Sequence, residues 1–395
     1  IHLRRPTTKN KLKLAKKINT KHYVDHVLTG KYQEMNKFHE SIFDINLLNI
    51  SKNLNYLKSK LRQSTKIIAV VKAYGYGHGD VEVAQELENL NVHAFWVADF
   101  EEGVILRKAG LKKPIIIANP SPRTTEQILK YNLDVVIYNF RLLDSFGKLN
   151  KKIKIHLKFN TGMNRFGFEE ADLIYLKKKM IKYPSLSIES VCSHLSSSGD
   201  ANQDHITLKQ MSAFERIILS FKHNFSIEPL FHILNTNGVL RFTKYQYNSV
   251  RIGIGIFGVS KDKNLRQIGS LSSSISQIRN LKKGDLIGYN ATYICKKKTR
   301  IAIVPFGYAD GLDRNLGNQK GSLFVNEKSC KIIGNISMDS CAIDITQTDA
   351  KEGDRVEIFG KNNSIYKICT QTNSIPYEFL SKINRRIKRI YHSTF

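Results

Sequence analysis

The chain has 395 residues, of which 41% are hydrophobic and 24% charged, so it can bury the core of a two-domain globular protein. Its formal net charge is +28, but the excess is mostly lysine spread among acidic residues, without a DNA-binding motif or an RNA-binding aromatic signature. We therefore expect a solvated basic surface and no specific nucleic-acid partner. No apolar run is long enough to span a bilayer, and no signal-type segment follows the basic start, so we expect no membrane association and a soluble cytoplasmic protein.

The cysteines indicate the redox compartment. They form no CxxC pair and do not cluster with histidine in a metal-binding pattern, standing apart at Cys192, Cys295, Cys330, Cys341 and Cys369. This usage is typical of free thiols in a reducing compartment. We expect no metal site.

The organised part of the chain begins after a basic segment. Residues 1–41 contain ten lysines or arginines against three acids and show weak periodicity, which predicts a basic N-terminal extension or linker. From Ser41 the pattern changes to a short strand, IFDIN. A stretch with leucines at helical spacing follows and continues to Leu61.

The most informative stretch is Ile67 to Gly79, IIAVVKAYGYGHG. Its β-branched run predicts a buried parallel strand that delivers Lys72 to its C-terminal end, where the sites of α/β proteins gather. Burial would depress the pKa of the amine and leave it nucleophilic, as a Schiff-base lysine requires. A strand-end lysine that extends to solvent would fit the same pattern. The glycines predict a tight turn that brings the backbone close to a ligand.

Seven further strand candidates alternate with helix-like stretches, at residues 94–99, 114–119, 134–139, 154–160, 190–195, 231–237 and 250–258. Eight strand and helix units over somewhat more than 200 residues fit a closed (β/α)8 barrel of the TIM type better than an open sheet, and we assign this barrel to residues 42–262. Polar residues at the strand ends would meet at one mouth, namely Lys72, Asn119, Asn139, Lys158, Asn160, His194, Asn235 and Arg251.

The remainder of the chain, residues 263–395, has a different pattern. Short β-rich pieces are bounded by turn signals at residues 283–285 and 352–354, which predicts a separate, mainly antiparallel β domain. The end, IPYEFLSKINRRIKRIY, predicts a short helix and a final strand.

The segment VVKAYGYGHG resembles the pyridoxal-phosphate lysine motif of the alanine racemases. Further segments match the pattern of that family in the same order, so the resemblance covers roughly residues 41 to 395: LKFNTGMNRFGF, VRIGIGIFG, GYNATY with VPFGYADGLDR, GNISMDSCAIDIT and IPYE. It implies a pyridoxal 5'-phosphate-dependent isomerase that interconverts L- and D-alanine and supplies D-alanine for peptidoglycan.

The resemblance also assigns the catalytic groups. Lys72 would hold the cofactor as a Schiff base and act as a base on one face of the substrate α-carbon. Tyr289, in GYNATY, matches the base on the opposite face, which is supplied by the second subunit of a homodimer with shared active sites. A racemase needs a proton to reach either face of a planar carbanion, which requires two bases. From spacing alone, Tyr289 would be a packing residue of a β hairpin.

Other residues match the cofactor and substrate contacts of the family. Arg251 would donate to the pyridine nitrogen and leave it unprotonated, and His194 would hydrogen-bond this arginine. The phosphate contacts map onto Tyr76, Thr236, Gly253, Ile254 and Tyr377, with Asn235 beside them. Arg165 and the Met338 backbone would hold the substrate carboxylate. Lys158 matches a lysine that is carbamylated in some relatives, and Tyr308 and Arg314 match residues of the narrow access channel.

The chain departs from the usual family residues at Tyr74, Asn160, Thr236 and Asn335. None of these changes removes a catalytic proton donor or acceptor, but Asn335 stands where many relatives have a channel arginine, so serine remains a possible substrate. Two other classes of function stay open from the residues. One is a broader-range racemase or an amino-acid decarboxylase of similar architecture with the same cofactor, and the other is a non-catalytic cofactor carrier or basic binding protein.

Overall fold

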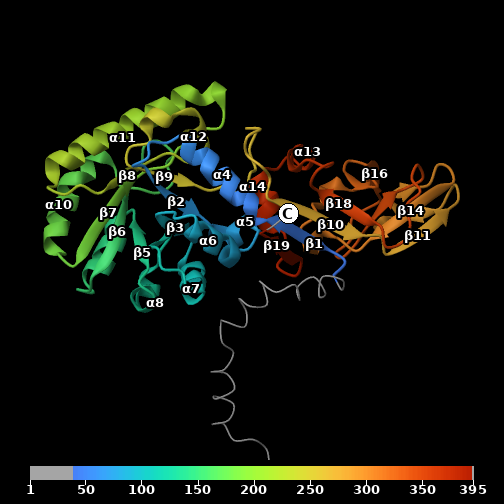
Figure 1. Cartoon of the computed structure of the whole chain (residues 1–395), viewed down its shortest axis with the longest axis horizontal. Helices are drawn as coiled ribbons and strands as arrows, with labels where there is room; N and C mark the ends of the chain where they lie inside the picture. Colours follow the sequence, from blue (N-terminus) through green and yellow to red (C-terminus); the bar gives the residue numbers. More distant parts are fainter. Residues whose placement is uncertain (1–38, 394–395) are drawn as a thin grey trace, which may run out of the picture.

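The computed structural model describes residues 39–393, so most of the predicted N-terminal extension lies outside the described residues. Two lobes lie side by side (Figure 1). One contains an eight-stranded parallel sheet with its covering helices, and the other contains a nine-stranded, mainly antiparallel sheet.

The first lobe is a nearly closed barrel, which confirms the predicted fold. Its strands are β2 (Lys66–Val70), β3 (Ala94–Val97), β4 (Ile115–Ile117), β5 (Asp134–Ile137), β6 (Ile153–Lys158), β7 (Leu186–Cys192), β8 (Leu230–His232) and β9 (Ser249–Ile252). They pair in the order β8-β7-β6-β5-β4-β3-β2-β9. Between the β8 and β9 segments, the Arg251 backbone N–H donates to the Leu234 carbonyl at 3.0 Å. The strands are apolar because both of their faces are covered.

Helices enclose the barrel (Figure 1). Helix α4 (Leu47–Ser59) precedes the first barrel strand, and the helices that follow barrel strands are α6 (Asp80–Asn89), α7 (Phe100–Lys108), α8 (Thr125–Lys130), α9 (Phe140–Gly147), α10 (Leu173–Lys182), α11 (Asp204–Asn224) and α12 (Thr236–Arg241). Several begin at a polar residue that follows a strand. Asn139 Oδ1 accepts from the backbone N–H of Leu142 at 2.8 Å, and Asn235 Oδ1 accepts from that of Gly238 at 2.9 Å. These two asparagines therefore cap helices at the barrel mouth.

The second lobe contains β1 (Ile42–Asn46), β10 (Gly269–Ser274), β11 (Gln277–Leu281), β14 (Thr299–Val304), β15 (Ser322–Val325), β16 (Lys328–Ile333), β17 (Cys341–Asp344), β18 (Arg355–Phe359) and β19 (Lys388–His392). A small ribbon of β12 (Leu286–Ile287) and β13 (Tyr293–Ile294) and the helices α13 (Ile365–Gln371) and α14 (Pro376–Lys382) complete it. The predicted final helix and strand are α14 and β19.

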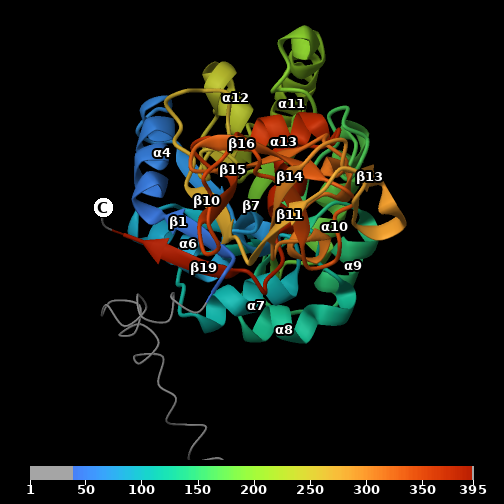
Figure 2. The same cartoon turned by 90° about the vertical axis from the view of Figure 1, so that its right-hand side faces the viewer.

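Strand β1 belongs to the second lobe, although we assigned its residues to the barrel segment. It pairs antiparallel with β10 and parallel with β19, and β1 and β19 run together in Figure 2. The sequence shows that five residues form a strand, but it does not show which sheet supplies the partner. The β domain therefore contains residues from both ends of the described chain.

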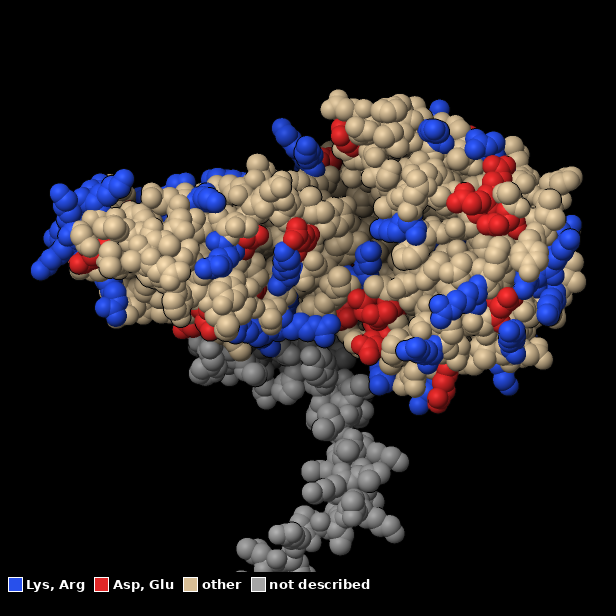
Figure 3. Space-filling model, turned by 180° about the vertical axis from the view of Figure 1, so that it is seen from behind, with Lys and Arg blue, Asp and Glu red and all other residues tan. Residues whose placement is uncertain are grey.

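The surface and core agree with the composition. The face in Figure 3 carries lysine and arginine over both lobes with acidic residues between them, so the positive charge on this face is dispersed. All five cysteines are free and buried. Among residues 39–393, no helix combines the length and the apolar character needed to cross a lipid bilayer.

Candidate active site

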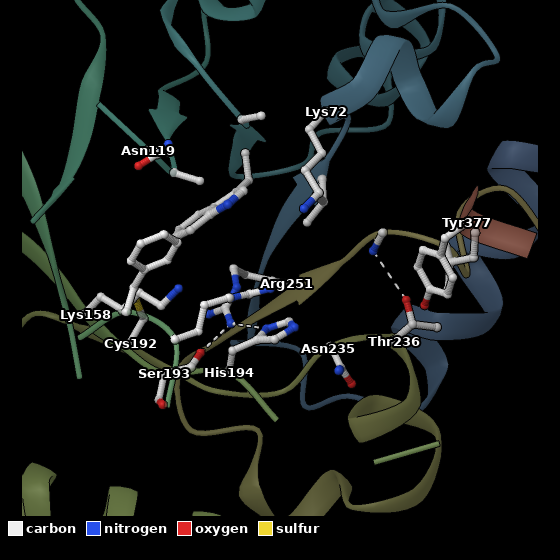
Figure 4. A pocket seen from close by; sticks show the side chains of 18 of the residues that line it. Lys72, Asn119, Lys158, Cys192, Ser193, His194, Asn235, Thr236, Arg251 and Tyr377 are labelled. Atoms are coloured by element: carbon white, nitrogen blue, oxygen red, sulfur yellow. Dashed lines mark hydrogen bonds between the residues drawn. The ribbon is translucent and has the colours of Figure 1, made fainter. Parts of the chain in front are cut away.

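A cavity of about 340 Å³ opens where the barrel strands end. Four cationic side chains line it, namely Lys72, Lys158, Arg165 and Arg251. None of the described residues that line the cavity is acidic. In Figure 4, the Lys72 amine extends into this space from one wall and Lys158 lies across it. Walls with charge of one sign raise the local concentration of ligands with the opposite charge. The cavity is therefore suited to an anionic ligand.

Lys72 is held at the start of a strained turn. The next four residues have left-handed backbone angles, with φ of 54° at Ala73, 55° at Tyr74, 57° at Gly75 and 52° at Tyr76. Left-handed conformation costs about 1–2 kcal/mol for each residue with a side chain. The prediction of a tight glycine turn was correct, but residues other than glycine share the strain. Such strain persists only where surrounding contacts enforce it.

Glu102 provides one of these contacts. Its Oε1 accepts from the Ala73 backbone N–H and its Oε2 accepts from that of Ala98, both at 2.7 Å. One carboxylate thereby ties the turn after Lys72 to the end of β3. Glu102 was missed by the sequence analysis, because it lies in a helical stretch where a glutamate is typical of a solvated surface.

The side chain of Lys72 is exposed to the cavity in this single chain, yet its pKa is lowered, as the sequence predicted. The partial burial of the amine between the cavity walls is the largest cause. The positive charge of Arg165 lowers this pKa further, and the negative charge of Glu102 opposes the shift. A larger fraction of the amine is therefore neutral and nucleophilic than in an isolated lysine.

Arg251 lies at the centre of the cavity, 5% exposed, and its guanidinium stacks over the Trp96 ring at 5.1 Å. Its hydrogen-bond partners in the described chain are neutral. One Nη2 bond goes to the Ser193 carbonyl and another to His194 Nδ1 at 3.1 Å (Figure 4). Nη1 bonds to His232 Nδ1. Burial strongly lowers the pKa values of both histidines, so they are neutral.

His232 is a second residue that the sequence analysis missed. It occurs inside the recognised strand segment FHILNTN, where a histidine between apolar residues could have indicated an inward-facing polar group. His194 was predicted to contact Arg251, and the 3.1 Å contact is present. The arginine therefore binds two imidazoles rather than one.

A cradle of backbone and hydroxyl groups lies beside Lys72, formed by Tyr76, Thr236, Gly253, Ile254 and Tyr377. Thr236 Oγ1 accepts from the Gly253 N–H at 3.3 Å and the Gly255 N–H at 3.2 Å. A Cβ on Gly253 would lie 2.4 Å from Tyr76 Oη, so any larger residue here would force the Tyr76 side chain to move. The cradle brings together all the residues that we predicted as phosphate contacts.

Arg165 is exposed in the loop after β6, and the loop is shaped by Asn160. Asn160 Oδ1 accepts from the backbone N–H groups of Gly162 and Asn164 at 3.1 and 3.0 Å, and its Nδ2 donates to Asn164 Oδ1 and Glu169 Oε1. An asparagine at this position therefore keeps the loop folded. Burial lowers the pKa of Lys158, at the end of β6, to about 8.

Tyr289 and Met338, predicted to act on the substrate, are not brought to this cavity within one chain, and neither are the predicted channel residues Tyr308 and Arg314. Tyr289 is 70% exposed and Met338 is 54% exposed, and neither lines the cavity. Both lie in the β lobe. The Tyr289 carbonyl accepts from Asn335 Nδ2 at 3.1 Å, so the turn that presents the exposed ring is held in place.

The cavity fits a phosphorylated pyridine aldehyde, because it combines a nucleophilic amine, a fixed cation and a close-packed cradle for an anionic group. A (β/α)8 barrel with these features, joined to a β domain, defines a class of pyridoxal-phosphate enzymes. The model of the alanine racemase N-terminal domain matches residues 45–261, and that of the C-terminal domain matches residues 268–391. The chain belongs to the alanine racemase family.

Individual relatives agree with this assignment. The alanine racemase of Thermodesulfovibrio yellowstonii is 35% identical over 88% of this chain and 96% of its own length. Alanine racemase 1 of Caldanaerobacter subterraneus is 33% identical over 87% of this chain and 92% of its own length. The structure of the alanine racemase from Bartonella henselae, with covalently bound pyridoxal phosphate, has a TM-score of 0.82 at 28% identity, covering 89% of this chain and 99% of that one.

Proposed function

We propose that this protein is a pyridoxal-phosphate-dependent isomerase that converts L-alanine to D-alanine and back by a two-base mechanism. The observation that carries the proposal is a cavity lined by two amines of lowered pKa, Lys72 and Lys158, and by two guanidinium groups, with no acidic residue among its described lining. An amino-acid carboxylate and a cofactor phosphate are the anions that this set can hold. A basic binding protein would not require the nucleophilic amine.

Lys72 is the residue that would hold the cofactor covalently. The cradle of Tyr76, Thr236, Gly253, Ile254 and Tyr377 would bind its phosphate, with Asn235 fixing the turn that carries Thr236. Arg251 would face the pyridine nitrogen. Because a guanidinium is a donor only, and its partners here are neutral, Arg251 would donate to that nitrogen and would not protonate it.

When bound, pyridoxal phosphate withdraws electrons from the α-carbon of the amino acid and makes its proton more acidic. The protein must then move that proton to either face. Lys72 reaches the α-carbon from the barrel side, as a base in its neutral form and as an acid when protonated. Arg165 would hold the substrate carboxylate through a charge-assisted bond, together with the Met338 backbone, and Tyr289 would serve the opposite face.

Two subunits would complete each site. Tyr289 and Met338 are exposed on the β lobe of this chain, away from its own cavity, and Tyr308 is 44% exposed on the same lobe. A second copy that docks its β lobe over the barrel mouth would supply these groups and exclude water. Tyr308 and Arg314 would then narrow the access channel.

A mixed dimer tests the shared site. Chains with Lys72→Ala and chains with Tyr289→Phe are each expected to be inactive as homodimers, because each homodimer lacks one base at both sites. The mixed dimer would contain one site with both bases, and unfolding and refolding the mixture should restore measurable racemisation. A mixture that forms dimers and stays inactive would contradict the shared site.

The substrate and the reaction type are tested by chiral chromatography. Alanine of either configuration should be converted to the racemate, with no release of carbon dioxide. Serine should be tested in parallel, because Asn335 leaves the selectivity of the channel open. Release of carbon dioxide without the other enantiomer would favour the decarboxylase. In the cell, we propose a cytoplasmic enzyme that supplies D-alanine for peptidoglycan.

A further inference from the structure

Five polar side chains form a continuous path through the interior of the barrel. They come from five strands that are consecutive in the chain, β5 to β9, and each is at most 5% exposed: Asp134, His156, Ser190, His232 and Arg251. Ser190 Oγ lies 2.7 Å from His156 Nδ1 and 3.0 Å from His232 Nε2. His156 Nε2 lies 3.5 Å from Asp134 Oδ2, which is an electrostatic contact. Arg251, next to the cavity, bonds to His232 Nδ1.

The path extends from one end of the barrel to the other. Asp134 is the first residue of β5, and it lines a second cavity of about 270 Å³ at the N-terminal ends of the strands, together with His156. Arg251 lines the active-site cavity at the opposite end. Polar groups inside a barrel are costly, and here His156 Nε2 has the carboxylate of Asp134 nearby but no hydrogen bond, so a path of this kind requires a reason.

The donor inventory gives every bond in the path one direction. A guanidinium can only donate, so His232 Nδ1 accepts and its proton is on Nε2. That Nε2–H donates to Ser190 Oγ, which leaves the single Ser190 O–H to donate to His156 Nδ1. The remaining His156 proton is on Nε2 and faces the Asp134 carboxylate. Arg251 thus only donates and Asp134 only accepts, whereas His232, Ser190 and His156 each have one donor role and one acceptor role.

We propose that Ser190, His156 and Asp134 are positioning residues of the active site, which hold His232 neutral with its proton on Nε2 so that Nδ1 orients Arg251. This inference rests on the proposed role of Arg251 at the cofactor ring. The Asp134 carboxylate fixes the His156 tautomer, and the direction of the Ser190 O–H then fixes the tautomer of His232. The His232 imidazole in turn orients the Arg251 guanidinium.

The opposite tautomers would conflict with the arginine. If the His156 proton moved to Nδ1, Ser190 would accept that bond and would be free to donate to His232 Nε2. The His232 proton would then be on Nδ1, where it would face the Arg251 N–H groups. The Nδ1–H of His232 and the N–H groups of Arg251 would then face each other in a buried site without an acceptor, and Arg251 would leave its present position.

Removal of the central hydroxyl tests the path, and the chain provides a matched control. Ser190→Ala interrupts it, whereas Ser249→Ala removes a hydroxyl that is equally buried, in β9, and that has no hydrogen-bond partner. Neither residue contacts the cavity. Ser190→Thr keeps the hydroxyl and serves as the conservative variant.

The primary measurement is nitrogen-15 NMR of histidine-labelled holoenzyme without substrate, which reports the tautomer of each ring, with assignment by His156→Gln. We expect both His156 and His232 as neutral Nε2–H forms in the wild type. In Ser190→Ala the His232 Nε2–H loses its acceptor while Arg251 still donates to Nδ1, so we expect a shifted Nε2–H signal and about fivefold weaker cofactor binding, the equivalent of one hydrogen bond. Ser249→Ala should match the wild type, and Ser190→Thr should retain the tautomer.

The inference is overturned by a wild-type His232 that carries its proton on Nδ1, or by a cofactor affinity in Ser190→Ala identical to that of the wild type. An equal change in Ser249→Ala would also overturn it, because the effect would then reflect general packing. These results are separate from the proposed function. The tautomers are measured without turnover, so absence of racemisation with the expected tautomers would reject the activity and not the path.

Discussion

Replacing Gly253 with alanine tests whether the cradle beside Lys72 binds the cofactor. The added carbon would lie 2.4 Å from Tyr76 Oη, whereas ordinary van der Waals contact begins near 3.4 Å. The Tyr76 hydroxyl would have to retreat by about 1 Å to restore such a contact. The ring has little room to do so, because it is 8% exposed and packs against Phe257 with centroids 4.9 Å apart.

A hydrogen bond to a charged group contributes about 1.5–3 kcal/mol, so loss of one phosphate contact should lower the affinity for pyridoxal phosphate by about 10- to 100-fold in Gly253→Ala. Overpacking should also lower the free energy of unfolding by about 1–3 kcal/mol. The assay is an absorbance titration of the apoprotein with pyridoxal phosphate, together with urea unfolding.

Gly147→Ala provides the control for overpacking alone. Its added carbon would lie 2.3 Å from the Tyr183 ring, and neither residue lines the active-site cavity. We expect a similar loss of stability with unchanged cofactor affinity. Wild-type affinity in Gly253→Ala, or an equal loss of affinity in Gly147→Ala, would refute the role of the cradle.

Three further predictions follow from the charged groups. The neutral Lys72 amine forms the bond to the cofactor, so the rate of cofactor incorporation should level off at a lower pH than for a lysine of ordinary pKa. Arg165→Gln removes the charge that lowers the Lys72 pKa most and should move this pH profile to higher pH. An unchanged profile in Arg165→Gln would contradict the assignment. His78 is fully buried with its pKa lowered to about 3, so the unfolded state binds more protons and the free energy of unfolding should decrease as the pH falls from about 6.5 towards 3. His78→Phe should flatten the urea-unfolding slope over that range by up to about 1.4 kcal/mol per pH unit, and an unchanged slope would show that other groups cause it. Lys158 has a pKa of about 8, so an appreciable fraction of its amine is neutral near pH 7 and can react with carbon dioxide. Carbon-13 NMR with labelled bicarbonate should therefore detect a carbamate that is absent from Lys158→Ala. Identical spectra for the two proteins would argue against carbamylation.

The barrel could be predicted from the sequence because each strand is an apolar run followed by a polar residue, and such runs pair in chain order. The lysine at the end of β2 was identified in the same way. The left-handed turn after it was not fully predicted. Glycine indicates positive φ, but Ala73 and Tyr74 adopt it only because tertiary contacts such as that of Glu102 enforce it.

The sequence does not show which side chains on different strands contact each other. Ser190 and His156 are 34 residues apart, and their contact depends on the register of two strands. The placement of β1 in the second lobe has the same cause, because pairing is decided by the assembled sheet. The role predicted for Tyr289 came from family resemblance, and its exposure in the single chain is consistent with a function in a partner's site.

The central claim is that Lys72 and Tyr289 deliver protons to opposite faces of the same carbon. The most direct test follows α-proton exchange of each alanine enantiomer in heavy water by NMR, with chiral chromatography of the products, in the wild type and in Tyr289→Phe. We predict that the wild type exchanges both enantiomers and racemises them, and that Tyr289→Phe exchanges one enantiomer with retention of configuration. Exchange of both enantiomers at the wild-type rate in Tyr289→Phe, or no exchange by cofactor-loaded wild type, would contradict the two-base account.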